Sequence, residues 1–176
     1  MSAAEILSSV EAFNVRAGRE KWATVCDEKL DFESSRLAEL REVWRTVRGT
    51  REMPRREDFT PRILGKHLQR LTFVECVREN GARRYRFRLF GSALAQYLGD
   101  STGKFLEEVV PEIFIASWIA TYGLVMETRA PMRFLSRFRA SHLDHVAAEC
   151  LVAPLAGEGS EPWGLMVSVV YSPVVI

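Results

Sequence analysis

The spacing of apolar residues changes once within a short stretch in the middle of the chain, and this change constrains the fold more than any other feature. Tyr85, Phe87 and Leu89 alternate with arginines, which is the period of a strand with one buried face. Gly91 ends that pattern, and Ser92 can cap a short helix. The chain is therefore expected to run from a half-buried strand directly into a helix, which is typical of an α+β fold.

After this helix comes a polar turn, Gly99-Asp100-Ser101-Thr102-Gly103, which is one residue shorter than the Gly-x-x-x-Thr-Gly pattern that it resembles. The whole segment resembles the front half of a PAS sensor domain, in particular a bacterial stand-alone PAS subfamily with an arginine-interleaved strand. Other matching segments extend the resemblance over about four-fifths of the chain; they are Val43-Trp44, Met53-Pro54-Arg55-Arg56, Asp58-Phe59-Thr60-Pro61 and Glu149-x-Leu151-x-x-Pro154-Leu155-Ala156-Gly157. Each motif is short, and their order carries the resemblance.

The hydrophobic pattern predicts a five-stranded antiparallel sheet with helices packed on one face. Expected strands lie at 71–77, 83–90, 132–140, 145–155 and 163–172, and the longest helix at 113–127. Two apolar stripes at helical spacing precede the sheet. We therefore divide the chain into an N-terminal helical extension at 1–48, a polar linker at 49–60 and a PAS-like domain at 61–176.

Composition fits a single globular domain of 176 residues with a net charge of +1. No apolar run reaches the roughly 18 residues of a membrane span, and the first residues lack the pattern of a signal peptide, so a cytoplasmic location is expected. Three widely spaced cysteines, Cys26, Cys76 and Cys150, indicate reduced packing residues.

Positive charge is concentrated in residues 45–88, which hold 13 Lys/Arg against 5 Asp/Glu. One interpretation is a surface that binds a polyanion such as a nucleic acid. The alternative is a solvated outer face, in which Arg84, Arg86 and Arg88 point to water. No helix-turn-helix or aromatic RNA-binding signature accompanies the arginines, which favours the solvated face and makes nucleic acid an improbable partner.

The sequence lacks the common catalytic and phosphate-binding motifs, so we expect no enzymatic activity. His142, Asp144 and His145, with Glu149 and Cys150 nearby, are the one group of metal-ligand types, but they are placed at a hairpin turn and no metal site is predicted.

The PAS resemblance bears on cofactors. Photoactive flavin members carry a cysteine motif before the central helix, and the matching segment Lys104–Pro111 has none. Haem-binding members commonly use a histidine of that helix, and residues 112–128 contain none. Both cofactors are disfavoured, although His67 or His145 would remain as unusual haem ligands, and the identity of any cofactor stays unknown.

What the resemblance implies is a pocket between the central helix and the sheet. The candidate lining residues are aromatic, with two serines as polar contacts: Phe87, Phe114, Trp118, Tyr122, Phe134, Ser136 and Ser168. Each of these residues can equally be ordinary core.

The expected function is a cytoplasmic sensory module that binds a small ligand or a protein partner. The alternatives are a ligand-free interaction scaffold and a polyanion-binding regulator. A narrow apolar stripe in the second helix, composed of Leu37, Leu40, Trp44 and Val47, predicts a homodimer interface, unless this helix folds back on the sheet of its own chain.

Overall fold

The computed structural model describes residues 1–27, 29–137 and 146–173. The helices are α1 (Ala3–Arg19), α2 (Ser35–Arg48), α3 (Pro61–Leu64), α4 (Ser92–Leu98), α5 (Leu106–Val109) and α6 (Glu112–Thr128), with 3-10 turns η1 (Arg56–Asp58) and η2 (Gly65–Arg70). The strands are β1 (Thr24–Asp27), β2 (Leu71–Glu79), β3 (Ala82–Phe90), β4 (Met132–Arg137), β5 (Val146–Ala156) and β6 (Pro162–Pro173).

The described strands form one antiparallel sheet in the order β1-β4-β5-β6-β2-β3. Five of them match the predicted strands, so the predicted α+β class is confirmed. The sixth, β1, was not predicted. It adds four residues to the edge beside β4, pairing Thr24 with Ser136 and Asp27 with Arg133.

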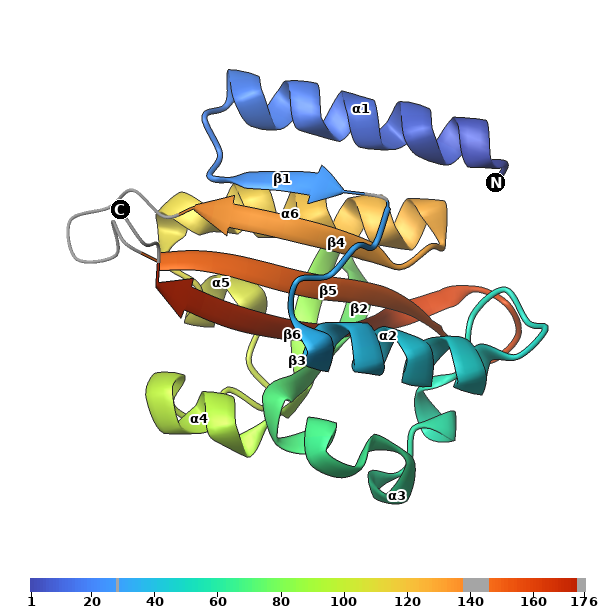
Figure 1. Ribbon diagram of the computed structural model, residues 1–176. Helices are drawn as coiled ribbons and strands as arrows, with labels where there is room; N and C mark the ends of the chain where they lie inside the picture. Colours follow the sequence, from blue (N-terminus) through green and yellow to red (C-terminus); the bar gives the residue numbers. More distant parts are fainter. Residues whose placement is uncertain (28, 138–145, 174–176) are drawn as a thin grey trace.

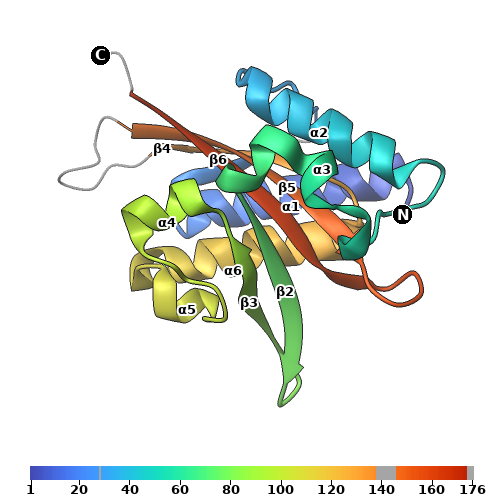
Figure 2. The same ribbon diagram turned by 90° about the horizontal axis from the view of Figure 1, so that it is seen from below.

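Helices cover both faces of this sheet, whereas helices on one face were predicted. Figures 1 and 2 show α2 on one side of the sheet and α6, with α1 beside it, on the other. Each face has its own hydrophobic core: α1 and α6 close over residues such as Tyr85 and Phe134, and α2 closes over residues such as Phe73 and Leu151. A sheet that is buried on both faces explains why β5 is apolar along nearly its whole length.

Strand β3 does not keep one register along its length. Tyr85 and Phe87 are buried against the α6 face as predicted, but a β-bulge falls opposite the Phe73–Val74 step. Phe87 pairs with Val74, and Leu89 with Phe73, which leaves Arg88 as the extra residue. The bulge turns Leu89 to the α2 face, where it is half-buried, so its predicted place beside Tyr85 and Phe87 is wrong.

Local sequence sets the ends of several elements. Asn80 and Gly81 adopt positive φ angles of 51° and 80°, as the two-residue turn between β2 and β3 requires. Thr60 caps α3 by accepting a hydrogen bond from the Ile63 N–H. Gly91, rather than the predicted Ser92, is the N-cap of α4. A Cβ on Gly91 would lie 2.4 Å from the Gln69 carbonyl oxygen, so only glycine fits where the start of α4 passes the backbone of η2.

Candidate functional site

Aromatic rings fill the space between α6 and the β3 end of the sheet. The Tyr85 and Tyr122 rings contact edge to face with centroids 5.0 Å apart, and Trp118 lies 5.4 Å from Tyr122. Tyr85 and Tyr122 are buried, while Trp118 is only partly buried. These three rings, which we call the aromatic layer, lead from the surface of α6 into the core.

Groups in the aromatic layer are held uncharged. Burial raises the pKa of Tyr85 to about 12 and raises that of Tyr122 well above its ordinary value. The neighbouring thiol of Cys150 is also buried, which raises its pKa. These three groups are buried and uncharged at neutral pH, so they offer an apolar or neutral molecule a better environment than an ion.

The other predicted pocket residues divide between the two faces. Phe87 and Phe134 belong to the same core as Tyr122, and Phe134 packs edge to face on Phe13 of α1. Phe114 is half-buried near the start of α6. The Ser136 hydroxyl lies 2.8 Å from that of Thr24, in hydrogen bond with β1.

Ser168 has a different position from the one predicted. Along β6, Met166 faces α2 and Val167 faces α6, so the next residue, Ser168, faces α2. Its hydroxyl donates to the Arg70 carbonyl oxygen at 3.0 Å. Ser168 therefore contacts η2 on the face opposite the aromatic layer.

The predicted dimer stripe is packed against the sheet of its own chain. Leu37, Leu40 and Trp44 are each no more than 2% exposed, and the Trp44 indole N–H donates to the Pro154 carbonyl oxygen at 3.0 Å. These three residues have no surface left for a second chain, and α2 takes the alternative arrangement of an intramolecular cover. Val47 is half-buried and remains accessible.

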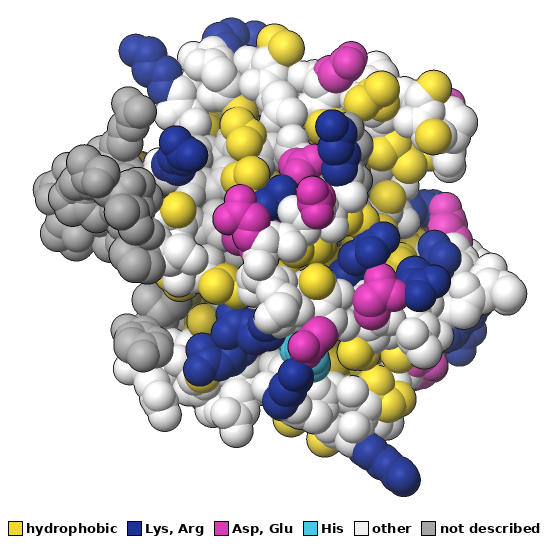
Figure 3. Space-filling view, in the orientation of Figure 1, with side chains coloured by type: hydrophobic (Ala, Val, Ile, Leu, Met, Phe, Trp, Pro, Cys, Tyr) yellow, Lys and Arg dark blue, Asp and Glu magenta, His cyan; other side chains and the backbone are white. Residues whose placement is uncertain are grey.

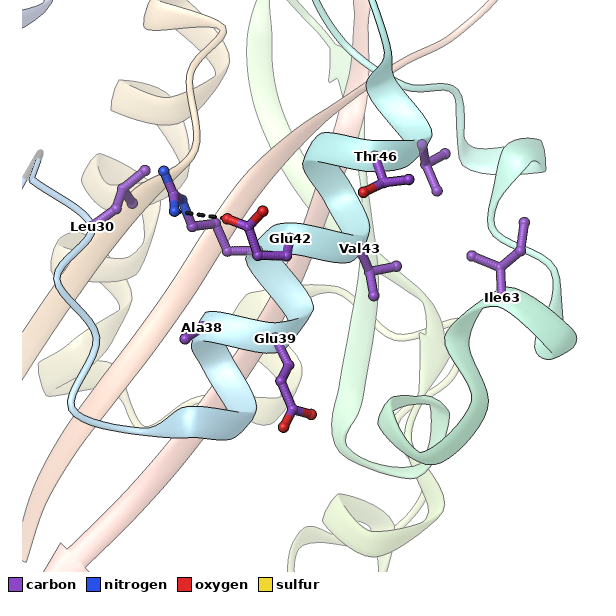
Figure 4. Close-up of a pocket in the computed structure, with 9 residues that line it drawn as sticks. Leu30, Ala38, Glu39, Glu42, Val43, Thr46 and Ile63 are labelled. Atoms are coloured by element: carbon purple, nitrogen blue, oxygen red, sulfur yellow. Dashed lines mark hydrogen bonds and ion pairs between the residues drawn. The ribbon is translucent and has the colours of Figure 1, made fainter.

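A shallow groove of about 670 Å³ runs along the outer side of α2. Its walls are mainly apolar and include Val43 and Val47 of α2. Figure 4 shows the Val43 side chain of α2 and the Ile63 side chain of α3 on either side of the groove. Glu42 lies on its rim and is paired with Arg41. The groove is on the face opposite the aromatic layer.

A buried ionic network fastens the N-terminal elements to the sheet. Arg133 of β4, which is 6% exposed, donates to Asp27 of β1 at 2.9 Å and to Glu149 of β5 at 2.7 Å. The Glu149 carboxylate also accepts from the backbone N–H groups of Glu33 and Ser34 at 2.9 and 2.8 Å, at the start of α2. One carboxylate thus replaces the missing side-chain cap of α2 and joins that helix to β5.

Most arginines of the basic segment 45–88 have carboxylate partners. Arg84 bridges Glu79 and Glu107, and Arg86 donates to Glu75 at 2.7 Å. Further pairs are Arg45–Glu42, Arg51–Asp58, Arg55–Glu57, Lys66–Glu39 and Arg83–Glu127. Several partners lie outside the segment, so much of the local excess of charge is neutralised in three dimensions.

Within the described residues, no three His, Cys, Asp or Glu side chains gather as metal ligands. His142, Asp144 and His145 lie outside the described residues. None of the described helices has the length and apolarity to cross a membrane.

A family model described as PAS domain matches residues 32–167. The chain belongs to the PAS-domain family. The match begins before α2 and ends within β6, so it includes the helix that covers the second face of the sheet. A search of curated proteins found no match. PAS domains are sensory and signalling modules, typically without catalytic activity, and they commonly mediate protein interactions.

Proposed function

We propose that this PAS domain is a non-catalytic sensory module whose aromatic layer receives a small neutral molecule. The observation that carries the proposal is the continuous contact from the partly exposed Trp118 through Tyr122 to Tyr85. Small-molecule sites are apolar and aromatic with few polar groups, and here the hydroxyl and thiol groups stay uncharged. A ligand that displaced Trp118 would move α6 against the sheet. Because α1 packs on both α6 and β1, this movement would be passed on to the N-terminal elements.

The experiment is mass spectrometry of the small molecules released when the purified protein is denatured. We expect a molecule that co-purifies with the native chain and that is lost from Trp118→Ala. Trp163→Ala is the matched control, because Trp163 is also partly buried but packs on the α2 face. A molecule retained by Trp118→Ala, or lost equally from both variants, would contradict binding at the aromatic layer.

A second candidate function is protein interaction through the α2 groove, and we propose a second copy of this chain as its occupant. The support is that Val47, the accessible member of the predicted stripe, lines this groove with the 45% exposed Ile63. Light scattering at micromolar concentration tests it: a homodimer that Ile63→Glu dissociates supports the proposal. A monomeric intact chain, or a dimer that this substitution leaves unchanged, contradicts it.

Polyanion binding through residues 45–88 has less support, because so many of these arginines are already paired. A bacterial, stand-alone role remains part of the proposal and follows only from the resemblance described above, and a cytoplasmic location follows only from the sequence pattern.

A further inference from the structure

Two arginines meet on the α2 face of the sheet, far from the aromatic layer. Arg36 lies in the first turn of α2, and its Nη2 donates to the Val169 carbonyl oxygen at 2.9 Å. Arg70 ends η2, and its carbonyl oxygen accepts from Ser168 at 3.0 Å. Because Ser168 and Val169 are neighbours in β6, the side chain of Arg36 and the backbone of Arg70 contact adjacent residues of the sheet.

The charge at this place is not balanced. Burial and, second, the charge of Arg70 lower the pKa of Arg36, so the two guanidinium groups are close enough to repel. Within the described part of the chain, neither arginine has a carboxylate at ion-pair distance. Glu39 is the near carboxylate, and it lies 2.5 Å from the ammonium of Lys66. Three cations and one carboxylate leave an excess of two positive charges.

Polar atoms beneath these charges also lack partners. Nε of Arg36 and Nδ1 of His67 are buried without a hydrogen-bond partner. His67 is 6% exposed, and its Nε2 lies 3.8 Å from the Glu39 carboxylate. Native proteins leave few buried polar groups unpaired, so each of these two atoms calls for a partner such as an ordered water or a bound ion. Figure 3 shows blue Lys and Arg side chains gathered on the surface beside the histidine.

The start of α2 supplies Arg36 but is not itself an open anion site. This helix of 14 residues has no acidic residue in its first turn, and its N-terminal end is already capped by the Glu149 carboxylate, which accepts from the Glu33 and Ser34 N–H groups. The positive charge that a further anion would meet is therefore that of the side chains.

We propose that Arg36, Lys66 and Arg70 bind the phosphate group of a small molecule, over β6 and between α2 and η2. A phosphate dianion matches the excess of two charges, and planar guanidinium groups pair with its oxygens in a fixed geometry. This anion site lies on the opposite face from the aromatic layer and does not depend on it. A bound phosphate joins α2 to η2 and so holds the cover of the second face in place.

The test is calorimetric titration of the intact protein with inorganic phosphate, with methyl phosphate and with acetate, each at a constant ionic strength of about 0.1 M to separate binding from screening. Methyl phosphate distinguishes a phosphate ester from the free ion, and acetate provides a single charge. We expect both phosphates to bind more tightly than acetate. Equal affinity for acetate and phosphate would overturn the assignment of a dianion.

Arg70→Gln is the informative variant, because its backbone contact to Ser168 is kept while the charge is removed. We expect its affinity for phosphate to fall about tenfold or more, since hydrogen bonds to charged groups are strong. Arg62→Gln is the matched control: it removes the same charge from exposed α3 nearby. Equal affinities of the two variants would show that phosphate senses only overall charge, and would refute the site.

Trp118→Ala separates this inference from the proposed sensory function. It should bind phosphate as the native chain does, whatever becomes of a ligand in the aromatic layer. Loss of phosphate binding in a folded Trp118→Ala protein would contradict two independent sites.

Discussion

Removal of the Glu149 carboxylate should undock α2 and β1 from the sheet. In Glu149→Ala, Arg133 keeps its ion pair with Asp27 at 2.9 Å but loses the one with Glu149 at 2.7 Å. The backbone N–H groups of Glu33 and Ser34, at the start of α2, also lose their acceptor. Breaking a buried ion pair from one side costs about 3–5 kcal/mol, because a charge is left buried without its partner. Asp27 still compensates part of the Arg133 charge, while the lost cap of α2 adds about 1 kcal/mol. We therefore expect a loss of about 3–4 kcal/mol in the free energy of unfolding.

Urea denaturation followed by circular dichroism measures this loss, and Glu161→Ala is the control. Glu161 also pairs with an arginine, Arg129, but its side chain is 82% exposed, so its removal should cost less than about 1 kcal/mol. Hydrogen exchange should show protection lost first in α2 and β1, since both are fastened by this network. Adding Arg133→Met to Glu149→Ala should restore part of the stability, because no buried cation is then left. A loss no larger than that of Glu161→Ala, or no recovery in the double variant, would refute the role given to the network.

Two further predictions concern the α2 face and the bulge. Burial lowers the pKa of His67 below its unfolded value of 6.5, so the unfolded chain takes up the proton at a higher pH than the folded chain does. In phosphate-free buffer, the free energy of unfolding should therefore fall as the pH drops below about 6.5. His67→Gln should remove this part of the pH dependence. Equal slopes of the free energy of unfolding in the native chain and in His67→Gln, measured by urea denaturation between about pH 5 and 7, would contradict it. Phe87→Ala should cost about 3–5 kcal/mol and Leu89→Ala only about 1–2 kcal/mol, because Leu89 is half-buried on the other face; equal losses in denaturation would argue against the bulge.

The sequence predicted those parts of the fold that local patterns encode. The central helix, expected at 113–127, spans Glu112–Thr128, and the Asn80-Gly81 turn joins two strands close to the predicted ranges. Strand β1 was missed because four residues carry no periodic signal, and their conformation depends on pairing with β4, more than a hundred residues away. The bulge at Arg88 was missed for the same reason, since it is defined by the partner strand.

The site was predictable only as a list of residue types. The aromatic residues of α6 and β3 were found from their spacing, and the structure brings Trp118 and Tyr122 together. Ser168 was assigned to the wrong face because the sequence did not reveal that β6 is buried on both sides. The positive cluster escaped notice because Arg36 and Arg70 are 34 positions apart and meet only through β6.

Both edges of the sheet are closed by pieces of chain that are not strands of it. At the β1 edge, the Asn14 side chain of α1 donates to the Cys26 carbonyl oxygen at 2.9 Å and accepts from the Cys26 N–H at 2.8 Å. At the β3 edge, Phe87 donates to the Lys104 carbonyl oxygen at 2.9 Å and accepts from the Gly103 N–H at 2.7 Å. An exposed strand edge is a template on which further strands polymerise. The edge hydrogen-bonding groups of Cys26 and Phe87 are used within the chain, so a further strand should find no partners at these two positions, and we expect association with other molecules at the helical surfaces instead.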